Sequence, residues 1–155
     1  MKAGSTLLKT WPLLAVIPFL ALGSTLAVDK ELFPYSTVAA SCAPWDGPAT
    51  ELRFSTTPLK CEQGDRIELT ISFWRNLPLH HNQTFSLDAK SNWGGASYCK
   101  DAKFPCERAS SGNIHIERFA EGVGAQGTYD LVFPKLGRVS GSFHADWCKT
   151  RLMCR

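Results

Sequence analysis

The sequence predicts an all-β fold. We expect an antiparallel β-sandwich of the immunoglobulin-like or jelly-roll kind, stabilised by disulphides, with a small β-barrel as the second choice. Three observations lead to this prediction. Apolar and polar residues alternate in several segments, no segment after residue 28 has helical periodicity, and the chain of 155 residues contains six cysteines.

The strands are predicted from period-two alternation, which gives each strand one buried and one solvated face. The clearest case is 67–74, where Ile67, Leu69, Ile71 and Phe73 alternate with polar neighbours. Pro134 to Gly137 is a turn signal that predicts a hairpin between the last two strands. The other strands are expected around 52–54, 85–87, 114–116, 129–133 and 139–145.

Residues 28–49 contain three prolines and no sustained periodicity, so they are expected to form an extended N-terminal arm. Cys42 would tie this arm to the sandwich domain at 50–155, and the two together would make one domain.

Residues 1–27 are predicted to be a cleavable signal peptide. Lys2 and Lys9 come before a short apolar stretch at 11–22. Small residues follow this stretch, and Thr25 and Ala27 fit a cleavage site before Val28. The apolar stretch is shorter than the ~20 residues that a membrane helix needs. We therefore expect a mature protein that is periplasmic or secreted and has no transmembrane segment after cleavage.

An even number of cysteines in an exported chain predicts disulphides. Two short spacings stand out, Cys99 to Cys106 and Cys148 to Cys154, and either pair could close locally. Cys42 would then pair with Cys61. No CxxC motif or zinc-finger spacing favours a metal or redox role for these residues.

The charge balance and the absence of known motifs exclude several classes of function. The chain has 17 basic and 14 acidic residues, and two of the basic ones lie in the signal peptide, so the mature chain is close to neutral and no nucleic-acid partner is expected. The string at 122–127 matches GxGxxG but precedes a strand, which indicates a loop instead of a dinucleotide site. No hydrolase, protease or nucleotide motif occurs, so the sequence favours a protein without enzymatic activity, with no catalytic residue, bound metal or cofactor assigned.

Aromatic residues beside Gly/Pro-rich loops point to binding. Segments 74–84 and 92–106 are the expected contact regions of a protein that recognises another extracytoplasmic macromolecule. An inhibitor or immunity-type protein would fit this description. The predicted contact residues are Trp74, Arg75, Leu77, Leu79, Trp93 and Tyr98.

Two alternatives stay open. In a carbohydrate-binding module, Trp93, Tyr98 or Trp74 would stack on a sugar ring, and Asn92 or Asp101 would bind its hydroxyls. In a metal-binding protein or enzyme, the surface residues His115, His144 and Asp146 would supply the ligands if the two histidine strands were neighbours.

Overall fold

The computed structural model describes residues 32–61, 66–74, 79–88, 90–100, 105–149 and 154. Nine strands and no helix occur in these residues, and all nine strands belong to one sheet. The strands are β1 (Tyr35–Cys42), β2 (Pro48–Ser55), β3 (Leu69–Trp74), β4 (Gln83–Leu87), β5 (Gly94–Tyr98), β6 (Glu107–Arg108), β7 (Ser111–Ala120), β8 (Gly124–Phe133) and β9 (Gly137–Cys148).

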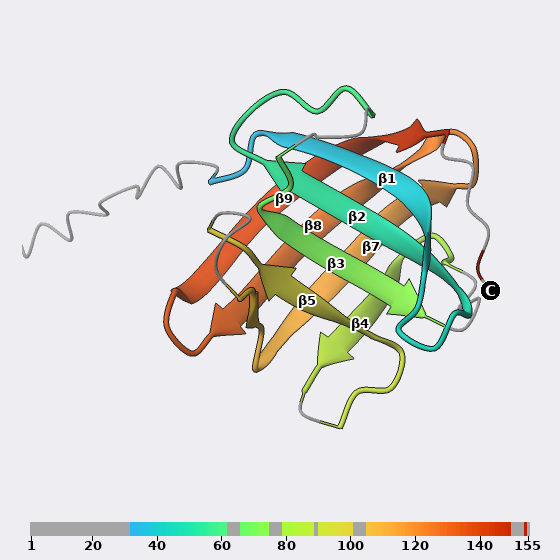
Figure 1. The fold of residues 1–155 in the computed structure, drawn as a ribbon. Helices are drawn as coiled ribbons and strands as arrows, with labels where there is room; N and C mark the ends of the chain where they lie inside the picture. The colour runs from blue at the N-terminus through green and yellow to red at the C-terminus, as the bar shows by residue number, and fades with distance from the viewer. Residues whose placement is uncertain are drawn as a thin grey trace, which may run out of the picture.

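One parallel pair joins the two halves of the sheet. The strand order is β4-β7-β8-β9-β1-β2-β3-β5-β6, and every pair is antiparallel except β1 with β9, where Thr37 lies opposite Asp146. In Figure 1, β1, β2, β3 and β5 lie in front of β7, β8 and β9 and cross them. The sheet is therefore curled into a half-barrel with its core between the two halves.

The chain between β6 and β7 is a second link between the two halves of the sheet. The Ala109 N–H donates to the Ala96 carbonyl of β5 at 2.9 Å, and the next N–H, from Ser110, donates to the Val132 carbonyl of β8 at 2.8 Å. Because these two adjacent residues bond to opposite halves, β6 and β7 act as one strand that turns the corner of the barrel.

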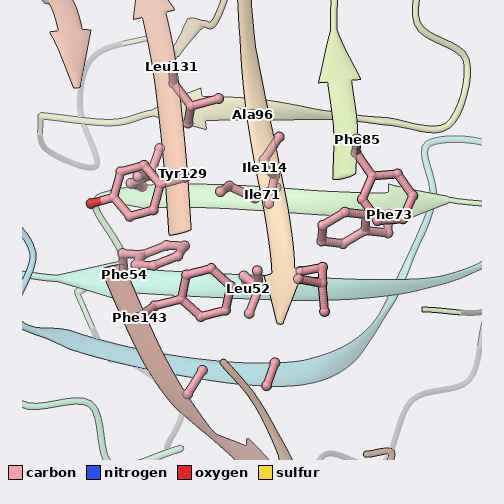
Figure 2. Close-up of a cluster of buried hydrophobic side chains, with 14 of the residues drawn as sticks. Leu52, Phe54, Ile71, Phe73, Phe85, Ala96, Ile114, Tyr129, Leu131 and Phe143 are labelled. Carbon is pink, nitrogen blue, oxygen red and sulfur yellow. The ribbon is translucent and has the colours of Figure 1, made fainter. Parts of the chain in front are cut away.

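The core is built from the inward-facing residues of both halves (Figure 2). Phe54 of β2 makes edge contacts with Tyr129 of β8 at 5.1 Å and with Phe143 of β9 at 5.7 Å between ring centroids. Such aromatic pairs add about 0.5–1.5 kcal/mol to the free energy of burial. The most deeply buried side chains include Leu52, Leu69, Ile71, Phe73, Ile114, Ile116, Leu131 and Phe133.

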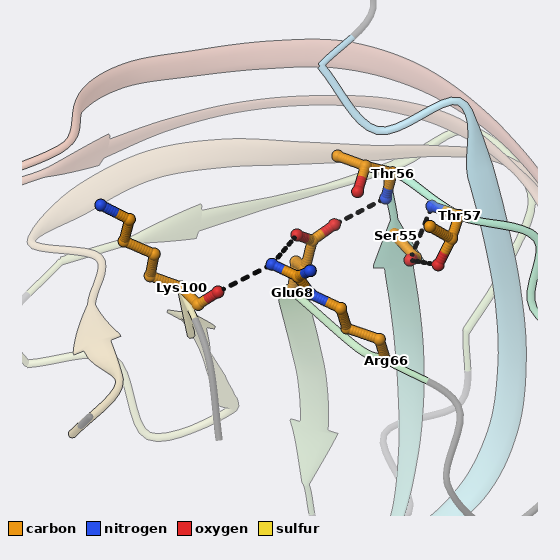
Figure 3. Close-up of polar contacts among 6 residues, drawn as sticks. All are labelled: Ser55, Thr56, Thr57, Arg66, Glu68 and Lys100. Carbon is orange, nitrogen blue, oxygen red and sulfur yellow. Dashed lines mark hydrogen bonds and ion pairs between the residues drawn. The ribbon is translucent and has the colours of Figure 1, made fainter. Parts of the chain in front are cut away.

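A polar cluster holds the start of β3 to two loops (Figure 3). The Glu68 side chain is 7% exposed, accepts the Thr56 N–H at 2.6 Å and pairs with Arg66 at 3.0 Å. Arg66 also donates to the Lys100 carbonyl at 3.0 Å. The buried carboxylate is thus satisfied by one backbone donor and one cation, as burial of a charge requires.

Three disulphides are present, as is typical of proteins that mature in an oxidising compartment. The local bond Cys99–Cys106 is confirmed. The other two suggested pairings, Cys148–Cys154 and Cys42–Cys61, are wrong, because the bonds are Cys42–Cys154 and Cys61–Cys148. The reason is the parallel β1–β9 pair, which places Ala39 opposite Cys148 and brings the ends of both strands to the same end of the sheet.

The predicted all-β, disulphide-stabilised fold is confirmed, and its curled single sheet corresponds to the barrel-like second choice more closely than to a two-sheet sandwich. All six predicted strands are present, and the 134–137 turn joins β8 to β9 as expected, with Gly137 at a φ of +86°. The predicted arm supplies β1, in the middle of the sheet. The loop expected at 122–127 is a shorter turn, since β8 begins at Gly124.

The predicted signal peptide lies outside the described residues. Within the described ranges, no helix is long and apolar enough to cross a bilayer.

Candidate ligand-binding groove

Three of the predicted contact residues pack against the core. Trp93 stacks on Phe73 at 5.5 Å with an interplanar angle of 24°, and its indole N–H donates to the Ser86 carbonyl at 2.9 Å. Tyr98 lies partly buried beside the core, and Leu79 is 8% exposed within it. Trp93 therefore connects the β3 half of the sheet to β4.

Trp74 has a different environment. It ends β3 on the outer face of the sheet, where its ring packs edge-on against Trp45 with 5.2 Å between ring centroids. Trp45 is 50% exposed and sits at the tip of the β1–β2 hairpin. The remaining two predicted contact residues, Arg75 and Leu77, lie outside the described residues.

Trp74 borders a groove of about 330 Å³ that lies between β3, β5, β6 and the turn after β4. This volume is at the lower end of the roughly 300–1,000 Å³ typical of small-ligand sites. The floor is formed by Gly94 and Gly95, and a Cβ atom at Gly95 would lie 3.9 Å from the Trp74 ring. The groove is lined by Ser72, Trp74, Leu87, Asp88, Ser91, Gly94, Gly95, Ala96, Ser97, Arg108 and Ala109.

The glycine floor follows from strand pairing. A side chain at Gly94 would place its Cβ 1.9 Å from the Ser72 carbonyl oxygen, so only glycine allows β5 to approach β3 this closely. Gly95, which lies opposite Ser72, adds no side chain to the outer face. Together the two glycines bring β5 close to β3 and keep the sheet beside the indole free of a side chain.

The polar residues of the groove come from separate elements. Asp88 follows β4 and is held in a tight turn, where its Oδ1 accepts the Lys90 N–H at 2.8 Å and the Ser91 hydroxyl at 3.1 Å. Arg108 lies opposite Ser97 in the β5–β6 pair. Among the described residues, no hydrogen bond or ion pair engages the Arg108 guanidinium. The groove thus holds one acid and one base that do not pair with each other.

A larger hollow, of about 540 Å³, lies on the outer face of β7, β8 and β9. Its two charged side chains pair with each other: Arg138 donates two hydrogen bonds to Asp130 at 2.6 and 2.7 Å. These bonds lower the pKa of Asp130 and raise that of Arg138. The aromatic residue that lines this hollow, Tyr129, is only 2% exposed, so the hollow offers a ligand neither an exposed aromatic ring nor an unpaired charge of the kind found beside Trp74.

The two histidines of the predicted metal site, His115 and His144, are not brought together. β8 separates β7, which carries His115, from β9, which carries His144. The His115 Nδ1 instead lies 2.9 Å from the hydroxyl of Thr84 on the neighbouring strand β4. Among the described residues, no carboxylate is hydrogen-bonded to this imidazole. His144 and Asp146 line a separate hollow with His81, and no group of three metal-ligating side chains is found in the described part of the chain.

Sequence reasoning singled out Trp74 but missed the residues that complete its groove. Asp88 and Ser91 form an Asx-type turn that the sequence can suggest from the spacing of the two residues. The sequence around this turn does not indicate that it lies near Arg108 in the fold. Trp45 was recognisable as a turn residue, because it is flanked by Pro44 and by Asp46-Gly47. Of the suggested sugar-binding residues, Asn92 is exposed outside the groove lining and Asp101 lies outside the described residues.

Searches of protein-family descriptions, of curated proteins and of solved structures found no match to this chain.

Proposed function

We propose that this protein is an exported, non-enzymatic binding protein that recognises another macromolecule through the groove beside Trp74. The observation that carries the proposal is the combination of a partly exposed indole, a glycine floor, the Asp88 turn and an Arg108 guanidinium that no described residue engages. Binding energy at recognition sites concentrates on a few aromatic and arginine residues, and this groove contains both types.

A rigid scaffold supports the same proposal. The groove residues come from strands and from a hydrogen-bonded turn, and the Cys99–Cys106 bond lies between the β5 and β6 parts of the lining. Pre-ordered side chains lose little conformational entropy on binding. An inhibitor or immunity-type role would use such a surface, and the disulphides suit work outside the cytoplasm.

Capture from the extracytoplasmic fraction of the producing cells tests the proposal. The immobilised mature protein is compared with Trp74→Ala and with the control Arg138→Ala, which alters the outer face of the other half of the sheet. Bound material is analysed for both protein and sugar. We expect Trp74→Ala to lose at least about tenfold of the captured material and Arg138→Ala to retain it. Equal capture by all three folded proteins would refute the proposal.

A further inference from the structure

The chemistry of the Trp74 groove identifies a class of ligand. We infer that the groove binds a neutral hexose unit of an oligosaccharide or polysaccharide, with the ring on Trp74 and its hydroxyls on Asp88 and Arg108. This inference rests on the proposed function and specifies its ligand.

The first argument is the platform. A pyranose ring has an apolar C–H face, which packs favourably against the face of an aromatic ring. Trp74 is held in position by the edge-on contact with Trp45 at 5.2 Å and lies beside Gly95, which has no side chain to obstruct a flat ligand. The platform is thus ordered before the ligand arrives, which lowers the entropic cost of binding.

The second argument is the set of polar groups around the platform. Sugar hydroxyls both donate and accept hydrogen bonds, so they need acceptors and donors at the same site. Asp88 supplies carboxylate oxygens, Arg108 supplies a fork of N–H donors, and Ser72, Ser91 and Ser97 supply hydroxyls. The turn contacts of Asp88 fix the direction of its carboxylate.

The third argument is charge. The groove contains one carboxylate and one guanidinium, so its ionisable lining is balanced and does not select for a strongly charged ligand. A neutral sugar can use both groups, whereas an anionic ligand would meet Asp88 and a cationic ligand would meet Arg108.

The test is a titration of the full mature protein with four neutral hexasaccharides: β1,4-linked glucose, β1,4-linked N-acetylglucosamine, α1,4-linked glucose and β1,4-linked mannose. Binding is followed by calorimetry and by tryptophan fluorescence. We expect at least one of these probes to bind. Trp74→Ala should weaken that binding at least about tenfold, and Asp88→Ala and Arg108→Ala should each weaken it about three- to tenfold.

Asp130→Ala and Arg138→Ala are the matched controls, because they remove the same two charge types from the other outer face. They should leave sugar affinity unchanged. Circular dichroism and melting curves confirm that each variant is folded. If no hexasaccharide binds, or if the control variants weaken binding as much as Asp88→Ala and Arg108→Ala, the inference is wrong. Trp74-dependent capture of a protein without sugar binding would overturn this inference and leave the proposed function standing.

Discussion

The two long-range disulphides should stabilise the protein non-additively, because each bond contributes less while the other is intact. Cys42–Cys154 spans 112 residues and Cys61–Cys148 spans 87, and the second loop is nested within the first. While one bond is intact, the other closes an effective loop of only about 20–25 residues, because the chain can follow the short path through the remaining bond. The chain-entropy model then gives a loss of about 3.5 kcal/mol for the removal of either bond alone.

Removal of both bonds should cost more than the sum of the single losses. Once the first bond is gone, the second closes its full loop, and the model gives about 8 kcal/mol for the pair, roughly 1 kcal/mol more than the two single values together. The locally paired arrangement would behave differently, because two separate short loops contribute independently.

The assay is guanidinium chloride unfolding of the wild type, C61S/C148S, C42S/C154S and the quadruple variant, all in one buffer. Sulphate is added to every sample if the quadruple variant is otherwise unfolded. Mass spectrometry of proteolytic fragments checks that the remaining bonds are native in each variant. Losses that add within experimental error would refute the nested-loop reasoning, as would unbonded Cys42 and Cys154 in C61S/C148S.

Three further predictions concern polar and aromatic contacts. Glu68→Ala should lower the free energy of unfolding by about 1–3 kcal/mol, and Glu68→Gln by less, because an amide oxygen can still accept the Thr56 N–H; denaturant unfolding measures both. The hydrogen bonds from Arg138 lower the pKa of Asp130 in the folded protein, so the ion pair stabilises the fold at pH values above the ordinary carboxyl pKa. This contribution is lost as the pH falls through the folded-state pKa of Asp130. Arg138→Ala should raise that pKa toward its usual value, which an NMR titration of Asp130 measures. Trp93→Ala should destabilise the protein by about 3 kcal/mol or more through lost packing, and equal melting temperatures for variant and wild type would contradict its structural role.

The candidate site was only partly predictable. Trp74 was identified because it ends an alternating strand on its polar side, and a strand's face is a local property. Trp93 precedes Gly94-Gly95, which also suggests an exposed loop, yet its ring stacks on Phe73 and its indole N–H donates to the Ser86 carbonyl. Which of two tryptophans is buried depends on the sheet's closure, and the sequence near each residue does not encode that closure.

The sequence by itself determined the features that arise from neighbouring residues. Alternation marked six strands, the 134–137 turn marked a hairpin, and a separation of 7 residues made the Cys99–Cys106 bond readable. β5 escaped detection because Gly94-Gly95 gives it little strand propensity; its pairing with both β3 and β6 stabilises it instead.

Only the tertiary structure decided how the ends of the chain meet. The parallel pairing of β1 with β9 connects residues more than a hundred positions apart, and no local pattern specifies that register. The same pairing brings together the cysteines of the two nested disulphides and joins the two halves of the curled sheet. The groove likewise combines residues from β3, β5, β6 and the turn after β4, which are distant in the sequence. Such contacts depend on the summed burial of the whole core, whereas turns and alternation depend on a few adjacent residues.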